Sequence, residues 1–153
     1  MKLSFGICTC RNCEFRKELP FLHPFTYGEF LLWSEDGECR YLCALNDPAF
    51  SEVADLVDQL VVGETLSGRA HKIQSIFGSV ACDRSTGGLT FEMHRLPRCS
   101  QCGECSVVFY GYVDPVVTVD METRAASHIE WDGCTTEEKL ARVAAALREI
   151  GSA

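Results

Sequence analysis

The chain has 153 residues, 46% of them hydrophobic and 24% charged, and its 22 acidic and 14 basic residues give it a net charge of −8. This composition is that of an ordinary globular protein, and its acidity argues against general affinity for nucleic acids, whose phosphates it would repel. Apolar runs fall far short of the roughly 18 residues that span a bilayer, and the start of the chain lacks the apolar region of a secretory signal, so we expect a cytosolic protein without a membrane segment.

The first third of the sequence predicts β structure. Strands are expected over residues 2–7, 30–34 and 39–45, and the last two pair across Glu35-Asp36-Gly37, in which Asp-Gly is a hairpin turn signal. Six aromatic residues cluster over residues 21–41, as expected for the core of a sheet: Phe21, Phe25, Tyr27, Phe30, Trp33 and Tyr41. The proline-interrupted segment 21–27 cannot be a regular strand throughout, and exposed aromatic residues in a loop there would be candidates for binding a partner.

Two helices are expected in the middle of the chain. Asn46-Asp47-Pro48 supplies an N-cap followed by a proline at the first helical position, and apolar residues then recur at three-four spacing up to Gly63. A second helix is predicted from about residue 66 to residue 77, with Gly78 as its left-handed cap. Strands over residues 80–82 and 89–93 are predicted to follow, joined by the turn residues 85–88.

The last third predicts strands and a closing helix. Strands are expected over residues 107–112 and 116–121, broken at Asp114-Pro115, and residues 127–131 are expected to pair back. Thr135 and Glu138 form a capping box for the final helix, and Gly151 follows its last turn. The sequence therefore predicts a single α+β domain over residues 1–153, an antiparallel sheet with about three helices.

Ten cysteines are the most informative feature of the sequence. In a reducing compartment they favour metal ligation or burial over disulfides. Structural zinc takes four ligands in a tetrahedron, and a C-x2-C step brings two sulfurs to one ion. Two such steps are present, and we expect them to share one zinc ion through Cys10, Cys13, Cys99 and Cys102. Gly103 supports this choice because the turn of a knuckle often needs a positive φ.

Cys8 and Cys105 are possible alternate ligands. Cys8 would point to the same side of a strand as Cys10, and Cys105 can replace Cys99 in a pair with Cys102. The four other cysteines are expected to be small core residues: Cys39, Cys43, Cys82 and Cys134. Of these, Cys39 and Cys43 share a face and are also compatible with a second metal pair. His94, near the second cluster, is a possible substitute ligand or simply a surface residue.

The two knuckles, at about residues 8–13 and 99–105, resemble a zinc ribbon and the related proteins with a CPxCG knuckle. The resemblance implies that each knuckle ends a β-hairpin and that the site stabilises the fold or docks a macromolecule. The chain differs from a simple ribbon in lacking the knuckle proline and in placing 85 residues between Cys13 and Cys99. A long insertion must therefore separate the two halves of the site.

Other readings of the cysteines remain open. C-x2-C-x2-C resembles a ferredoxin cluster, but the run lacks the Cys-Pro that would follow, and position 109 is Phe. A thiol redox pair would need a C-x2-C step that opens a helix, which neither step clearly does. Basic residues flank both clusters and can offset the charge of a tetrathiolate site, namely Arg11, Arg16, Lys17, Arg95 and Arg98.

Catalytic motifs are missing from the sequence. His128-Ile129-Glu130 follows the cysteines instead of preceding them, so the deaminase pattern fails, and no H-E-x-x-H, G-x-S-x-G or phosphate-binding loop occurs. The sequence thus favours a non-enzymatic, zinc-stabilised cytosolic protein that binds another protein, as an inhibitor, immunity-type or regulatory factor. The alternatives are a nucleic-acid-binding or transcription-linked zinc ribbon that uses the flanking arginines, and a zinc or thiol redox enzyme.

Overall fold

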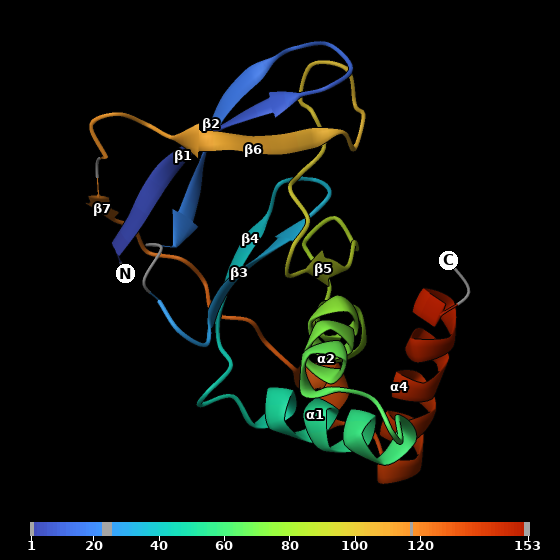
Figure 1. The fold of residues 1–153 in the computed structure, drawn as a ribbon. Helices are drawn as coiled ribbons and strands as arrows, with labels where there is room; N and C mark the ends of the chain where they lie inside the picture. Colours follow the sequence, from blue (N-terminus) through green and yellow to red (C-terminus); the bar gives the residue numbers. More distant parts are fainter. Residues whose placement is uncertain (1, 23–25, 117, 152–153) are drawn as a thin grey trace.

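The computed structural model describes residues 2–22, 26–116 and 118–151 (Figure 1). It contains two antiparallel sheets and a group of helices, so the fold is α+β, as predicted. The first sheet has the order β2-β1-β6, with β7 also paired to β1, and consists of β1 (Lys2–Cys10), β2 (Arg16–Leu22), β6 (Val107–Tyr112) and β7 (Thr118–Asp120). The second sheet has the order β4-β3-β5 and consists of β3 (Glu29–Ser34), β4 (Cys39–Cys43) and β5 (Phe91–Glu92).

The helices pack on one face of the second sheet, and the first sheet lies on its other side (Figure 1). They are α1 (Pro48–Leu60), α2 (Leu66–Ala81), α3 (Ile129–Asp132) and α4 (Thr136–Gly151). None of the described helices is both long and apolar enough to cross a membrane.

Strand β3 contributes side chains to two hydrophobic cores, because successive side chains of a strand point to opposite faces. Leu32 packs into the core between the second sheet and the helices, together with Val53, Phe77, Phe91 and Trp131. Leu31 and Trp33 pack into the core between the two sheets. The second sheet is therefore buried on both faces, which explains its continuous apolar run.

Helices α1 and α4 form where the local sequence signals predict them. Asp47 caps α1, since its carboxylate accepts a hydrogen bond of 2.8 Å from the Phe50 amide, and Pro48 begins the helix. The capping box of α4 is complete: the Thr135 amide donates to Glu138 (2.8 Å) and the Glu138 amide donates to Thr135 (3.3 Å).

The strand predicted over residues 80–82 is wrong, because α2 continues through Gly78 to Ala81. Gly78 is not a cap. A Cβ atom at this position would lie 2.1 Å from the carbonyl oxygen of Phe91, so glycine lets α2 pack directly on the backbone of β5. The strand predicted over residues 89–93 is reduced to Phe91–Glu92.

The strand predicted over residues 127–131 is also wrong, since Ile129–Asp132 form α3. The Asp83 carboxylate accepts hydrogen bonds from the amides of Ile129 (3.1 Å) and Glu130 (2.9 Å) and so caps the helix from a distant part of the chain. The described residues thus form four helices instead of about three.

Strand β2 was not predicted, and it pairs with β1 from Arg16 to Leu22. Of the segment that we expected to expose aromatic residues, Phe21 belongs to β2 and Tyr27 is 84% exposed. Phe25 lies outside the described residues.

Candidate metal centre

Pairing of β6 with β1 brings the two cysteine knuckles together. The first knuckle is the turn that joins β1 to β2, and the second lies in the loop over residues 93–106 that leads from β5 to β6. Cys10 pairs with Val107 in the ladder, and the Arg11 amide donates to the Ser106 carbonyl at 3.0 Å. The first knuckle thus ends a hairpin, whereas the second does not.

The four sulfur atoms form one compact group. Those of Cys10, Cys13, Cys99 and Cys102 all lie within 4.8 Å of one another. The Sγ–Sγ distance is 3.6 Å both between Cys10 and Cys102 and between Cys13 and Cys99. A tetrahedral ion with Zn–S bonds of about 2.3 Å requires S···S edges of about 3.8 Å. The group therefore has the size and ligand number of a tetrathiolate metal site.

The two knuckles have the same backbone structure. The Cys10 amide donates to the Phe15 carbonyl and the Glu14 amide to the Cys10 carbonyl, both at 2.9 Å. In the second knuckle the amides of Cys99 and Gly103 make the equivalent bonds, to Glu104 and Cys99, again at 2.9 Å. Gly103 has the positive φ that the sequence predicts (77°), and Glu14 takes the equivalent conformation at 59°. Glu14 therefore bears strain that glycine avoids.

The surroundings of the thiols favour a bound cation. The hydroxyl of Ser106, 3.5 Å from the Cys10 sulfur, lowers the pKa of that thiol to about 6, with help from nearby amides. The Cys102 amide lowers the pKa of Cys99. The pKa of Cys13 is raised to about 12, because burial and the neighbouring thiols outweigh its hydrogen bond to the Phe15 amide. Four such close thiols cannot all ionise without a positive charge among them.

Neither alternate ligand belongs to the group. Cys8 is 1% exposed in the core between the sheets, and burial raises its pKa to about 11. Cys105 is exposed, with its sulfur 4.0 Å from a carboxylate oxygen of Glu35. Within the described residues no second cluster of three or more potential ligands is close enough to share an ion, so Cys39 and Cys43 form no such cluster.

Two of the flanking arginines brace the second knuckle. Arg98 donates to the Glu35 carboxylate at 2.7 Å and to the Gly103 carbonyl at 3.3 Å. Arg95 makes an ion pair of 3.2 Å with the same Glu35. The Glu35 carboxylate, in the β3–β4 turn, therefore holds the loop that carries Cys99 and Cys102, a role that the sequence did not reveal. Ser106 was also missed, because serine beside a cysteine carries no signal of its own.

Two histidines, His94 and His128, make contacts away from the four thiols. The Nε2 atom of His94 lies 2.9 Å from the side-chain oxygen of Gln74 on α2. His128 has both ring nitrogens engaged, one 2.8 Å from the Ala81 carbonyl and the other 3.1 Å from the Asp47 carboxylate. His128 therefore has no free nitrogen with which to act as a general base.

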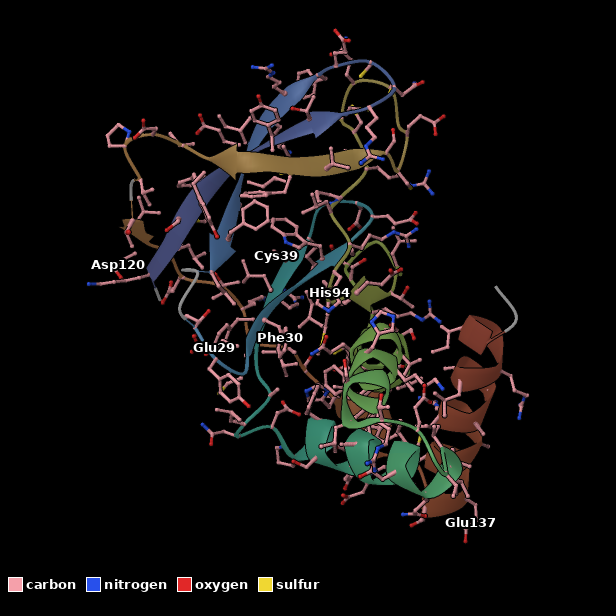
Figure 2. The ribbon with its side chains drawn as sticks, viewed as in Figure 1. Glu29, Phe30, Cys39, His94, Asp120 and Glu137 are labelled. Atoms are coloured by element: carbon pink, nitrogen blue, oxygen red, sulfur yellow. The ribbon has the colours of Figure 1, made fainter. Side chains whose placement is uncertain are left out.

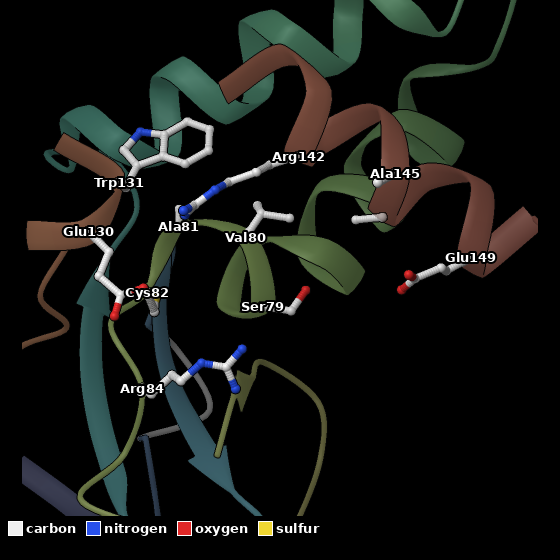
Figure 3. A pocket seen from close by; sticks show the side chains of 11 residues that line it. Ser79, Val80, Ala81, Cys82, Arg84, Glu130, Trp131, Arg142, Ala145 and Glu149 are labelled. Atoms are coloured by element: carbon white, nitrogen blue, oxygen red, sulfur yellow. The ribbon is translucent and has the colours of Figure 1, made fainter. Parts of the chain in front are cut away.

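A cavity of about 320 Å³ lies between α2, α3 and α4 (Figure 3). Arg84, Arg142, Glu130 and Glu149 line it, so its charges balance. Cys82 also lines it, but burial raises the pKa of this thiol to about 12, which makes it a poor nucleophile.

An ion held by these four thiols would have no open coordination position. Four thiolates fill every position of a tetrahedral ion, whereas catalytic zinc keeps one position for water. No protein-family model, curated protein or solved structure matches the chain.

Proposed function

We propose that the four cysteines hold one structural Zn²⁺ ion and that the protein acts by binding another protein, without catalysis of its own. The observation that carries the proposal is the closed group of four sulfurs within 4.8 Å. Tetrahedral sulfur ligation suits zinc or iron, and an iron–sulfur cluster of the ferredoxin type would draw on Cys105, which lies outside the group. Zinc is the better candidate.

The position of the ion supports a structural role. It would join the β1–β2 turn of the first sheet to the loop that leaves β5 of the second sheet. Only the folded chain brings these distant segments together, so the binding free energy of the ion stabilises the fold. The thiols must stay reduced to do this, so we place the protein in a reducing compartment such as the cytosol.

A protein partner fits the remaining features. With a net charge of −8, the chain should repel nucleic acids and attract basic surfaces. The titratable groups described above are engaged in structural contacts, as for His128, or are poor nucleophiles, as for Cys82. Inhibition, immunity and regulation are the roles that we propose for such a binding protein.

Two measurements test this function together. Affinity purification from the native cells should recover a stoichiometric protein partner with the zinc-loaded chain, and not with the chain after zinc has been removed. Fluorescence anisotropy with labelled single-stranded DNA should show no binding at moderate salt. Tight DNA binding that weakens steeply with salt would instead support the nucleic-acid alternative.

A further inference from the structure

The edges of the two sheets differ in how they are protected. An edge strand exposes unpaired backbone groups, and proteins shield such edges with charges, prolines, short length or a covering segment. Strand β2 carries Arg16, Lys17, Glu18 and Pro20. Strand β7 has three residues and ends in Asp120. These two edges of the first sheet are therefore protected in ordinary ways.

The second sheet has protected edges as well. Residues 124–126 run beside β4, where the Tyr41 amide donates to the Arg124 carbonyl (2.9 Å) and the Ala126 amide donates to the Tyr41 carbonyl (2.8 Å). Strand β5 has two residues and packs on α2 at Gly78. Neither edge offers room for a further strand.

Strand β6 has no such protection. Its sequence, VVFYGY, contains neither charge nor proline, and Phe109 and Tyr110 are 43% and 74% exposed. The Arg11 amide donates to the Ser106 carbonyl, and hydrogen-bonded pairs alternate along an antiparallel ladder. The amide and carbonyl of Val108 therefore point toward β1, and those of Val107 and Phe109 point outward. In the described part of the chain no strand pairs with this outer edge. A register shift between Ile7 and Cys8 leaves Tyr110 without a partner on β1, and pairing resumes at Gly111 and Tyr112. The uninterrupted part of the edge is therefore Val107–Phe109.

An apolar groove lies beside this edge, between the two sheets. It has a volume of about 510 Å³, and its lining includes Phe21, Phe30, Trp33, Met93, Val107 and Phe109. Figure 2 shows side chains from both sheets in the space between β6 and β3. Gly6 makes the groove wall possible, because a Cβ atom there would lie 2.5 Å from the Phe109 ring.

We propose that the outer edge of β6 is the docking site for an extended segment of the protein partner, which adds a strand to the first sheet. The proposal rests on the proposed binding function and names its site. Outward amides and carbonyls are complemented by another extended backbone, and alternate side chains of the added strand enter the groove, so these must be apolar.

The charges of the groove select a neutral or basic segment. Glu29 lines the groove and accepts a hydrogen bond from the Tyr41 hydroxyl, but it has no cationic partner among the described residues. Arg95, the arginine of the lining, is already paired with Glu35 and Glu92. A second copy of this chain would bring another charge of −8, which disfavours it as the occupant.

The metal centre controls this site. The loop that holds Cys99 and Cys102 also supplies Met93 to Leu96 of the groove and continues through Ser106 into β6. Loss of the ion would free both the groove wall and the start of the strand. Peptide binding should therefore require the metal.

Selection from a displayed library of random peptides of about nine residues tests the proposal, with the zinc-loaded full chain as bait. Enriched peptides should be apolar at alternate positions and should carry basic instead of acidic residues. They should slow hydrogen exchange at the amides of Val107 and Phe109. Val107→Pro removes an outward donor and leaves the bonds of Val108 to β1 intact, so it should weaken binding at least about tenfold.

A change in the peptide provides a control that does not depend on the folding of the variant. Methylation of alternate backbone nitrogens of an enriched peptide should abolish its binding, while methylation of the other set should not. If the two methylated peptides bind equally well and Val107→Pro has no effect on peptide binding, the β6 proposal is overturned while the binding function stands. If the native partner is recovered but no peptide is enriched, the same conclusion follows, and absence of any partner would remove the function as well. A dimer that Val107→Pro dissociates would assign the edge to a second copy and overturn the proposed occupant.

Discussion

Removing one ligand from each knuckle is the most informative perturbation of the metal centre. Cys13→Ser combined with Cys102→Ser leaves two thiols, which are too few to hold zinc. Cys13 is half-buried and Cys102 is exposed, whereas Cys10 and Cys99 are 1% and 4% exposed. The double variant therefore removes the ion with little loss of packing.

Cys13 and Cys99 are separated by 86 positions, so the unfolded chain does not hold the four thiols together and releases the ion. The expected cost therefore follows from mass action. With free zinc at about a thousand times its Kd, the bound ion stabilises the folded state by about 4 kcal/mol. This is a large share of the roughly 5–15 kcal/mol by which domains are stable, and for a chain of this size it corresponds to a fall in Tm of about 10–18 °C.

Urea unfolding followed by circular dichroism measures this cost, with the wild-type protein in excess zinc as the reference. Cys43→Ser with Cys105→Ser is the matched control, because it also removes two thiols but neither is in the metal group. The control should stay within about 0.5 kcal/mol of wild type. A double variant at Cys13 and Cys102 that is as stable as this control would refute a structural role of the ion.

Two pairs of glycine substitutions test the local structure. Glu14→Gly should stabilise the zinc-loaded protein by about 0.5–1 kcal/mol, and Gly103→Ala should destabilise it by a similar amount, because both positions have positive φ. Thermal melts measure both changes. If the two substitutions shift Tm in the same direction, the knuckles are not equivalent. Gly78→Ala should cost about 2 kcal/mol despite better helix propensity, since its Cβ would lie 2.1 Å from the Phe91 carbonyl oxygen. Gly68→Ala in the same helix meets only a flexible glutamate side chain and should be neutral or stabilising, so a loss at both positions would argue against the tight packing of α2 on β5.

Sequence reasoning succeeded where the signal is local. The N-cap Asp47 and the capping box of Thr135 and Glu138 act within one helical turn, so the sequence alone locates α1 and α4. The two C-x2-C steps likewise carry their geometry in their spacing. The structure brings together the four cysteines chosen from that spacing.

The failures share a different cause, because each depends on a contact that is distant in sequence. Helix α3 is capped by Asp83 and therefore looks like a strand in isolation. Gly78 looks like a helix end until β5 is seen to pack on it. Strand β2 reads as polar because its charged residues and Pro20 protect an edge, and the need for that protection arises only in the assembled sheet.

We expect one zinc ion to be bound by four of the ten cysteines. Native mass spectrometry of protein purified without added metal, followed by alkylation of the intact protein, tests it most directly. We expect one zinc per chain, with Cys10, Cys13, Cys99 and Cys102 protected from alkylation until a chelator is added. A metal-free protein that remains folded, or protection of a set that includes Cys8 or Cys105 in place of these four, would contradict the account.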